Sequence, residues 1–224
     1  MKKCLLCHQD IQYQVPLSQL LFGPTPQEPS LCPDCQKRFR PRPQNGCQAC
    51  GRPCDRKLCN DCQLWQNEYG WVLKNHSLYH YDQAMKDFMR QYKFMGDYRL
   101  HQVFQEEITQ KIQSLQPTLV VSIPATPHTL MTRGFNQAAA LYTGPLSELL
   151  GHLQADKQPQ TSKGRQARLS TPQPFVLTSS ASLATEHIVL LDDIYTTGRT
   201  LYHAADLLRQ AGCQDVQSVT LPAK

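Results

Sequence analysis

The chain has 224 residues, a formal net charge of +5 and a hydrophobic fraction of 40%. This length allows one medium-sized domain and a small one, and the mild positive charge permits nucleic-acid or nucleotide partners without demonstrating them. No apolar run approaches the roughly 20 residues of a membrane span, and no apolar stretch that could act as a signal peptide follows Met1. We therefore expect a cytoplasmic protein without membrane insertion, whose ten cysteines are reduced and available to metal.

Eight cysteines form four Cys-x-x-Cys pairs near the start of the chain: Cys4/Cys7, Cys32/Cys35, Cys47/Cys50 and Cys59/Cys62. Two such pairs complete a tetrahedral Zn²⁺ site, so we expect these eight residues to hold two structural zinc ions. Pairing in sequence order is the preferred arrangement, an interleaved one stays open, and Cys54 competes as a ligand for the second site. Redox chemistry is the rival interpretation, and it is disfavoured because redox motifs come singly.

Segment 1–65 is rich in Cys, Pro, Gln and Arg and shows no sustained helical or strand periodicity. A segment of this kind cannot bury enough apolar surface to fold alone and needs metal staples. We expect a double zinc ribbon over residues 1–65, a linker and a first strand over 66–80, and the main domain over 81–224.

Apolar periodicity predicts alternating helices and strands in the main domain. A helix opens after Asp82, with its buried stripe at Met85, Phe88, Met89 and Tyr92. Further helices are expected at residues 100–115, 135–150 (one helix kinked at Gly144-Pro145, or two short helices) and 200–211. Strands are expected at residues 118–123, 175–177, 187–191 and 216–221, and a polar, basic, mobile loop at 155–173. This alternation indicates an α/β fold with a mainly parallel sheet and flanking helices.

The strand at 187–191 runs into two acids and then into a turn rich in hydroxyl groups, which comprises Asp192, Asp193, Thr196, Thr197, Gly198, Arg199 and Thr200. Backbone N–H groups and threonine hydroxyls at the start of a helix suit a phosphate. The two carboxylates would then lie about one ribose away, where they can accept hydrogen bonds from its hydroxyls. An ordinary strand, turn and helix with a polar cap is the alternative.

Residues 189–201 resemble the phosphoribosyl pyrophosphate (PRPP) motif of type I phosphoribosyltransferases. Tyr81-Asp82, the Lys-Phe-Met-Gly-Asp run at 93–97, the Arg-Gly-Phe-Asn-Gln run at 133–137 and the four cysteine pairs resemble the ComF family of bacterial competence proteins. The resemblance covers essentially the whole chain. It implies a double zinc ribbon joined to a type I phosphoribosyltransferase-like domain. It also implies a role in natural transformation, handling incoming single-stranded DNA beside a helicase-like ATPase of the ComFA type.

The resemblance further implies roles for individual residues. Asp192 and Asp193 would be catalytic and would hold the ribose with Mg²⁺, while Arg168 of the mobile loop would stabilise the departing pyrophosphate, together with Lys163 and Arg165. A solvated basic loop is an equal alternative. The residues expected to bind PRPP or phosphate are Asp192, Asp193, Thr196, Thr197, Gly198, Arg199, Thr200 and Arg133. The chain departs from the family at Thr129, where an arginine five residues after Pro124 is usual.

The leading hypothesis is a cytosolic DNA-uptake factor that reaches the inner face of the membrane through partners. The alternative is a working phosphoribosyltransferase that transfers ribose 5-phosphate from PRPP to a base. Basic residues between Lys37 and Lys57, with Phe39 and Trp65 nearby, suit contact with single-stranded DNA, and scattered solubilising charge is the competing interpretation. No helix-turn-helix pattern indicates a regulator, and no Gly-x4-Gly-Lys-Ser/Thr motif supports an ATP-driven motor.

Overall fold

The computed structural model describes residues 2–13, 21–23, 29–42, 46–94, 96–153, 172–180 and 182–224. Its centre is a four-stranded parallel sheet with the strand order β1-β6-β5-β2. The strands are β1 (Lys74–His80), β2 (Leu119–Ser122), β5 (His187–Asp192) and β6 (Asp215–Ala223). A smaller antiparallel pair joins β3 (Leu150–His152) to β4 (Phe175–Leu177). The expected α/β class with a mainly parallel sheet is confirmed.

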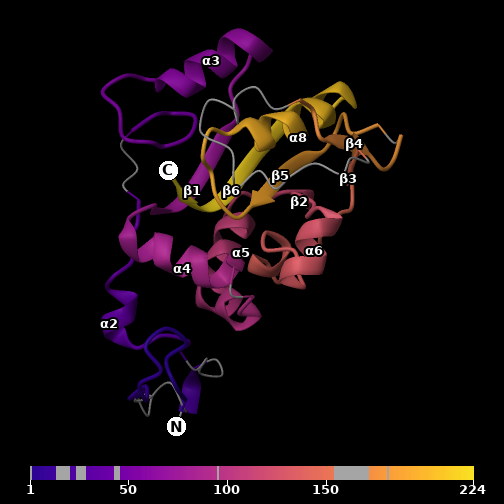
Figure 1. The fold of residues 1–224 in the computed structure, drawn as a ribbon. Coiled ribbons are helices and arrows are strands. Elements are labelled where there is room, and N and C mark those ends of the chain that lie inside the picture. The colour runs from indigo at the N-terminus through magenta and orange to yellow at the C-terminus, as the bar shows by residue number, and fades with distance from the viewer. Residues whose placement is uncertain are drawn as a thin grey trace.

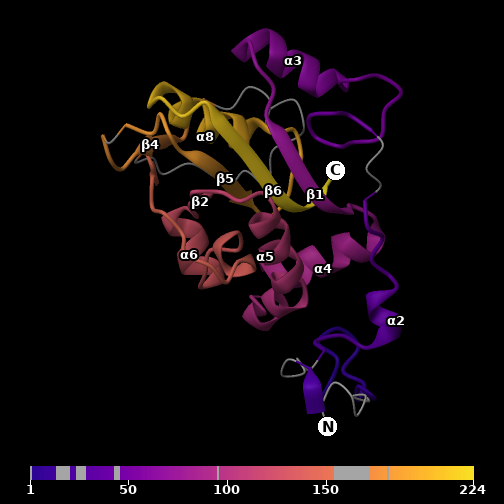
Figure 2. The same cartoon turned by 180° about the vertical axis from the view of Figure 1, so that it is seen from behind.

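Three helices cover the two faces of the main sheet: α4 (Gln83–Phe94), α5 (Gln105–Ser114) and α8 (Arg199–Gln210). Helix α8 lies on one face, and α4 and α5 lie on the other, as Figures 1 and 2 show. Among the described residues, no helix has the length and apolar character needed to cross a bilayer.

The central strand β5 is buried on both of its faces. Ile188 and Leu190 pack in the cluster that contains α8, whereas Val189 and Leu191 pack in the cluster that contains α4 and α5. All four side chains are fully buried. A parallel strand covered on both faces has a continuous apolar sequence instead of an alternating one, which explains the run at 187–191.

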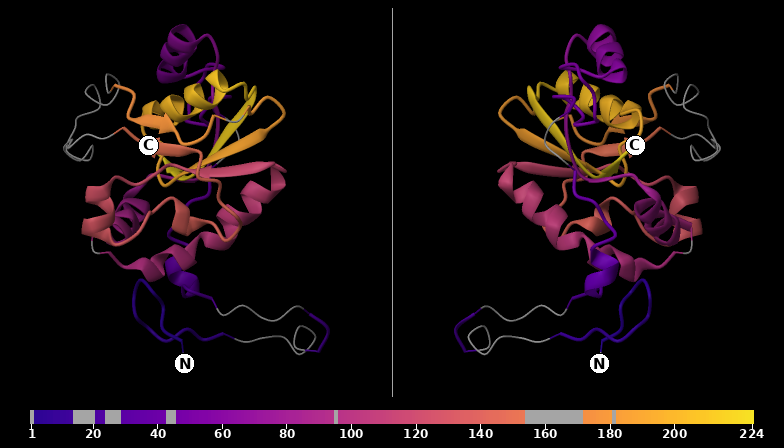
Figure 3. Two further views of the ribbon diagram at one scale, coloured as in Figure 1. Left: turned by 90° about the vertical axis from the view of Figure 1, so that its right-hand side faces the viewer. Right: turned by 90° about the vertical axis from the view of Figure 1, so that its left-hand side faces the viewer.

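The two halves of the cysteine-rich segment lie on opposite faces of the sheet, as Figure 3 shows. Helix α2 (Pro33–Gln36) and the first two cysteine pairs lie beyond α4 and α5. Helix α3 (Asn60–Tyr69) and the last two pairs lie on the α8 side. Helix α3 crosses position 65, and the division of the chain into domains stays a prediction.

The strand predictions are confirmed, and so are the helices after Asp82 and at 200–211. The helix expected at 100–115 is divided into a 3₁₀ helix, η1 (Tyr98–Val103), and α5. Helices α3 and α6 (Pro127–Arg133) were not predicted. The loop expected at 155–173 falls almost entirely outside the described residues.

The helix expected at 135–150 is wrong, because that stretch contains only a short 3₁₀ turn, η2 (Ala139–Leu141), before β3 begins. The Asn136 side chain accepts hydrogen bonds from the backbone N–H groups of Ala138 and Ala139, at 3.0 and 3.2 Å. Such local bonds compete with helical ones. Arg133 is the last residue of the preceding helix α6, which Gly134 closes at a φ of 81°.

Candidate functional site: the acidic end of β5 and two cysteine clusters

The two predicted acids lie at the carboxyl end of β5, where ligands bind in open parallel sheets. Asp192 is the last residue of the strand, and its Oδ1 accepts a hydrogen bond from the backbone N–H of Asp193 at 2.8 Å. Burial, and next the charge of Asp193, raise the pKa of Asp192 to about 7. A cation or a hydroxyl donor that approaches such a buried carboxylate stabilises its ionised form.

Lys93 begins the run at 93–97 that carries the family resemblance, but no role in the site was predicted for it from the sequence. Its Nζ lies 2.6 Å from Oδ2 of Asp193, and the two side chains are only 15% and 13% exposed. Lys93 comes from the last turn of α4, four residues after the buried Met89. A lysine in line with the buried stripe of a helix was the signal in the sequence that could have identified it. The ion pair offsets one of the two acidic charges.

The hydroxyl-rich turn, residues 193–200, runs from the end of β5 into the first residues of α8 and places a glycine where other residues would not fit. Gly198 has a φ of 85°, and an added Cβ there would lie 2.3 Å from the hydroxyl of Tyr195. The hydroxyl of Thr197 accepts from the backbone N–H of Arg199 at 3.4 Å. Thr196 and Thr200 are partly exposed beside the start of the helix. The turn therefore brings Thr196, Thr197, Gly198 and Thr200 to one helix N-terminus.

Arg199 is engaged on another surface. Its guanidinium pairs with Glu68 and donates to the hydroxyl of Tyr69, both on α3, and it lies 5.3 Å from the ring centre of Trp65. These contacts join the first turn of α8 to the cysteine-rich segment. The expected role of Arg199 in phosphate binding stays a prediction.

The loop after β2 is held by the side chains of the Arg-Gly-Phe-Asn-Gln run. Arg133 donates to Oε1 of Gln137 at 3.0 Å, and Asn136 donates to the carbonyl of Ile123 at 3.0 Å. Tyr92 on α4 also donates to the carbonyl of Gln137, at 2.8 Å. Thr129 takes part in the N-cap of α6, because its backbone N–H donates to Thr126. Arg168, Lys163 and Arg165 lie outside the described residues.

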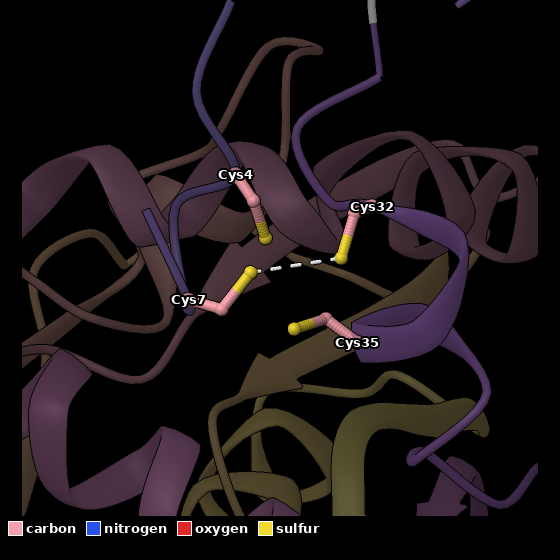
Figure 4. Close-up of side chains that lie close together, drawn as sticks. All are labelled: Cys4, Cys7, Cys32 and Cys35. Atoms are coloured by element: carbon pink, nitrogen blue, oxygen red, sulfur yellow. Dashed lines mark hydrogen bonds between the residues drawn. The ribbon is translucent and has the colours of Figure 1, made fainter. Parts of the chain in front are cut away.

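The eight cysteines form two clusters, grouped in sequence order as preferred. The first cluster is Cys4, Cys7, Cys32 and Cys35, and the second is Cys47, Cys50, Cys59 and Cys62. Within each cluster all sulfur atoms lie within 4.8 Å of one another. Figure 4 shows the first cluster, whose sulfurs converge on one point, with Cys7 and Cys32 3.7 Å apart. Cys54 stays outside, and its thiol donates to the carbonyl of Arg56.

Neighbouring groups within a cluster change the pKa values of its thiols, as the first cluster shows. Burial alone would raise the pKa of Cys4, but backbone N–H groups of Cys7 and Cys32 outweigh it and lower that pKa to about 6. Burial and the contact with Cys32 raise the pKa of Cys35 to about 12. Ionisation of one thiol thus disfavours ionisation of the next thiol. A bound divalent cation compensates this repulsion between thiolates. Four thiolates at this spacing fit tetrahedral Zn²⁺ and leave no open position for chemistry.

The basic residues between Lys37 and Lys57 do not form one surface. Arg42 donates to the carbonyl of Gly51, and Arg52 pairs with Asp61, so the structure uses both internally. Lys37, Arg38, Arg40, Arg56 and Lys57 are exposed. Phe39 and Trp65, the aromatic residues expected to take part in contact with single-stranded DNA, are 6% and 2% exposed, so neither ring can stack on a base and that part of the expectation is wrong. Their apolar surface belongs to the core.

A parallel sheet with an acidic strand end and a hydroxyl-rich turn is the arrangement expected of a phosphoribosyltransferase domain. The family model of the phosphoribosyl transferase domain matches residues 108–224. These residues include β2, β5, β6, α8 and the turn between β5 and α8.

Relatives with curated names match nearly the whole chain. It is 36% identical over 220 residues to competence protein ComFC of Streptococcus pneumoniae, covering 98% of this chain and 99% of the relative. It is 31% identical over 229 residues to competence protein ComFC of Bacillus subtilis, covering 97% and 93%. It is 25% identical over 205 residues to competence protein F of Haemophilus influenzae, covering 84% and 87%. The chain belongs to the ComFC family of competence proteins.

Proposed function

We propose that this competence protein binds PRPP or a related sugar phosphate at the hydroxyl-rich turn and handles incoming single-stranded DNA in the cytoplasm. Contact with a helicase-like ATPase of the ComFA type would bring it to the inner face of the membrane. The observation that carries the sugar-phosphate site is the position of Asp192 and Asp193 beside that turn, at the carboxyl end of β5.

The parts of the site suit different parts of such a ligand. The N-terminus of the twelve-residue helix α8 offers backbone N–H groups and a positive dipole to the 5-phosphate. Asp192 and Asp193 would accept from the ribose hydroxyls. Carboxylate oxygens also suit Mg²⁺, which would neutralise the pyrophosphate. Lys93 offsets one acidic charge and so reduces the repulsion of an anionic ligand. Arg133, the last residue of α6, would add positive charge, and so would Arg168.

Transfer of ribose 5-phosphate to a base is the second candidate, favoured by the match of residues 108–224 to a transferase domain. A nitrogen of the base would attack the anomeric carbon, and the bond to the pyrophosphate oxygen would break. Thr129 stands where the family usually has an arginine, and it serves the cap of α6. This replacement weakens the expected hold on pyrophosphate and favours binding over rapid turnover.

Calorimetry with PRPP and Mg²⁺ tests the site. The double variant Asp192→Asn/Asp193→Asn keeps the shape of both side chains and removes their charge, so we expect it to lose measurable binding. Asp206→Asn is the control, because Asp206 lies within α8, beyond the hydroxyl-rich turn, and accepts a hydrogen bond from Gln210. Unchanged affinity in the double variant would contradict the site. Consumption of PRPP with a panel of bases would then separate turnover from binding.

A further inference from the structure

The second cysteine cluster contacts the hydroxyl-rich turn through Arg52, which lies in the loop between its two cysteine pairs. Arg52 donates from Nη1 to Oδ2 of Asp61 at 2.6 Å, from Nη2 to the carbonyl of Thr196 at 2.6 Å, and from Nε to the carbonyl of Lys224 at 2.8 Å. Asp61 stands between Cys59 and Cys62 and is 4% exposed. One guanidinium therefore connects a cysteine pair, the turn and the last residue after β6.

Trp65, on α3 directly after the second cluster, makes a second contact with the hydroxyl-rich turn. Its Nε1 donates to the carbonyl of Thr197 at 2.7 Å, and the side chain is 2% exposed. Its ring lies 5.3 Å from the ring of Tyr202 on α8. Two successive carbonyls of the turn, those of Thr196 and Thr197, are thus fixed by side chains of the cysteine-rich segment.

Fixing these carbonyls also fixes the donors of the turn. In a planar trans peptide the C=O of one residue and the N–H of the next point in opposite directions. Because the carbonyls of Thr196 and Thr197 face Arg52 and Trp65, the N–H groups of Thr197 and Gly198 face away from the second cluster. These are the donors that a phosphate at the start of α8 requires.

Tyr195 fills the space under the turn. Its side chain is 1% exposed, and its hydroxyl, which has no hydrogen-bond partner among the described residues, lies where a Cβ on Gly198 would fall. Burial, and next the charges of Cys62 and Cys50, raise its pKa well above the usual value, so the hydroxyl stays protonated beside the cluster. The turn therefore rests on a packed layer continuous with the second cluster.

We propose that Arg52 and Trp65 are positioning residues of the sugar-phosphate site, and that metal binding by the second cysteine cluster sets the geometry of the hydroxyl-rich turn. The ligand named here rests on the proposed function above, whereas the positioning itself does not. Zinc held by Cys47, Cys50, Cys59 and Cys62 would fix the pair that carries Asp61, and through it the guanidinium of Arg52. The first cluster packs on the other face of the sheet and would not affect the turn.

Two conservative variants test the proposal. Arg52→Lys keeps the charge but cannot reach three acceptors at once, and Trp65→Phe keeps a ring but removes the N–H donor. Arg56→Lys is the matched control, because Arg56 lies in the same loop, is exposed and bonds to Asn60. The measurements are zinc content, amide hydrogen exchange of residues 193–200, and PRPP affinity by calorimetry.

We expect full zinc content in all three variants. In Arg52→Lys and in Trp65→Phe, hydrogen exchange of the turn should be faster and PRPP binding about ten-fold weaker than in the parent. Arg56→Lys should match the parent in every readout. Unchanged exchange of the turn in Arg52→Lys would overturn the proposal, even if Trp65→Phe fails to fold. If the parent itself does not bind PRPP, the proposed ligand fails, and the exchange measurement still decides whether the second cluster positions the turn.

Discussion

Each of the two clusters consists of four cysteines, and the clusters differ in the residues that surround them. In the first cluster 24 residues lie between the two pairs, Cys7 is exposed, and the neighbours are apolar side chains on the α4 side of the sheet. In the second cluster 8 residues lie between the two pairs, all four cysteines are buried, and the loop between the pairs supplies Arg52 to the hydroxyl-rich turn. A metal-binding motif alone therefore does not define a role, because the residues between its pairs decide what the metal holds in place.

Loss of the metal ligands should reveal the largest difference between the clusters. Structural zinc contributes on the order of 10 kcal/mol to small modules. Cys62→Ser should therefore lose one zinc and much of the stability of the chain, since Cys62 belongs to the buried cluster beside β5 and α8. Cys7→Ser should also lose one zinc but lower the free energy of unfolding much less. Metal analysis and urea unfolding measure both effects.

The parent should contain close to two zinc ions per chain. A value near zero, with disulfides in place of thiolates, would contradict the metal assignment. Equal losses of stability in Cys7→Ser and Cys62→Ser would contradict the difference between the clusters.

Asp192, next to the hydroxyl-rich turn, should make the free energy of unfolding depend on pH. Because the folded state raises the pKa of Asp192 to about 7, it binds this proton more tightly than the unfolded chain does. The free energy of unfolding should fall as pH rises from about 4 to about 7, by on the order of 4 kcal/mol at most. Urea unfolding of zinc-saturated protein between pH 5.5 and 8 measures the upper part of this fall, and Asp192→Asn should remove it.

Asp34→Asn is the control, because Asp34 is an exposed acid between Cys32 and Cys35 of the first cluster. It should leave the pH profile of the parent unchanged. An Asp192→Asn profile that follows the parent would show that Asp192 does not carry the predicted cost.

The smallest expected effect concerns DNA, and it compares the basic residues beside each cluster. Lys37, Arg38 and Arg40 are exposed next to the first cluster, while Arg56, Lys57 and Lys74 line a groove of about 500 Å³ next to the second. On single strands, log affinity should fall with log salt by about 0.7 per phosphate contact. Replacing either set of three by alanine should weaken binding for all sequences and flatten that slope by about 2 if all three contact phosphates.

The set that flattens the slope identifies the DNA-contacting surface. If the variant of Lys37, Arg38 and Arg40 binds DNA as the parent does but no longer binds the ATPase partner, the first cluster is a docking module. Salt dependence that stays unchanged in both variants would move DNA contact away from the two clusters.

Much of the fold could be predicted from the sequence. The continuous apolar run of β5, the helical period of the buried stripe of α4 and the spacing of the cysteine pairs are all local signals. The helix at 135–150 failed because Asn136 forms local bonds that no periodicity reveals.

The site was predictable only in part. Asp192, Asp193 and the turn are contiguous in sequence, so the motif contains them. Lys93, Arg52 and Trp65 reach the site from distant segments, through contacts of 100, 144 and 132 residues in sequence separation. Such contacts depend on the packing of α3 and α4 against opposite faces of the sheet, which no local pattern encodes.

One measurement tests most directly whether the second cluster sets the turn. Zinc is removed stepwise from the parent with a coloured chelator while the hydrogen exchange of residues 193–200 is followed. The same titration on Cys4→Ser/Cys7→Ser, which should hold zinc at the second cluster alone, identifies the ion that matters. The account predicts that this variant starts with a protected turn and loses the protection as its one zinc leaves. A turn already exposed in this variant, or one that stays protected after all zinc has left, would contradict the account.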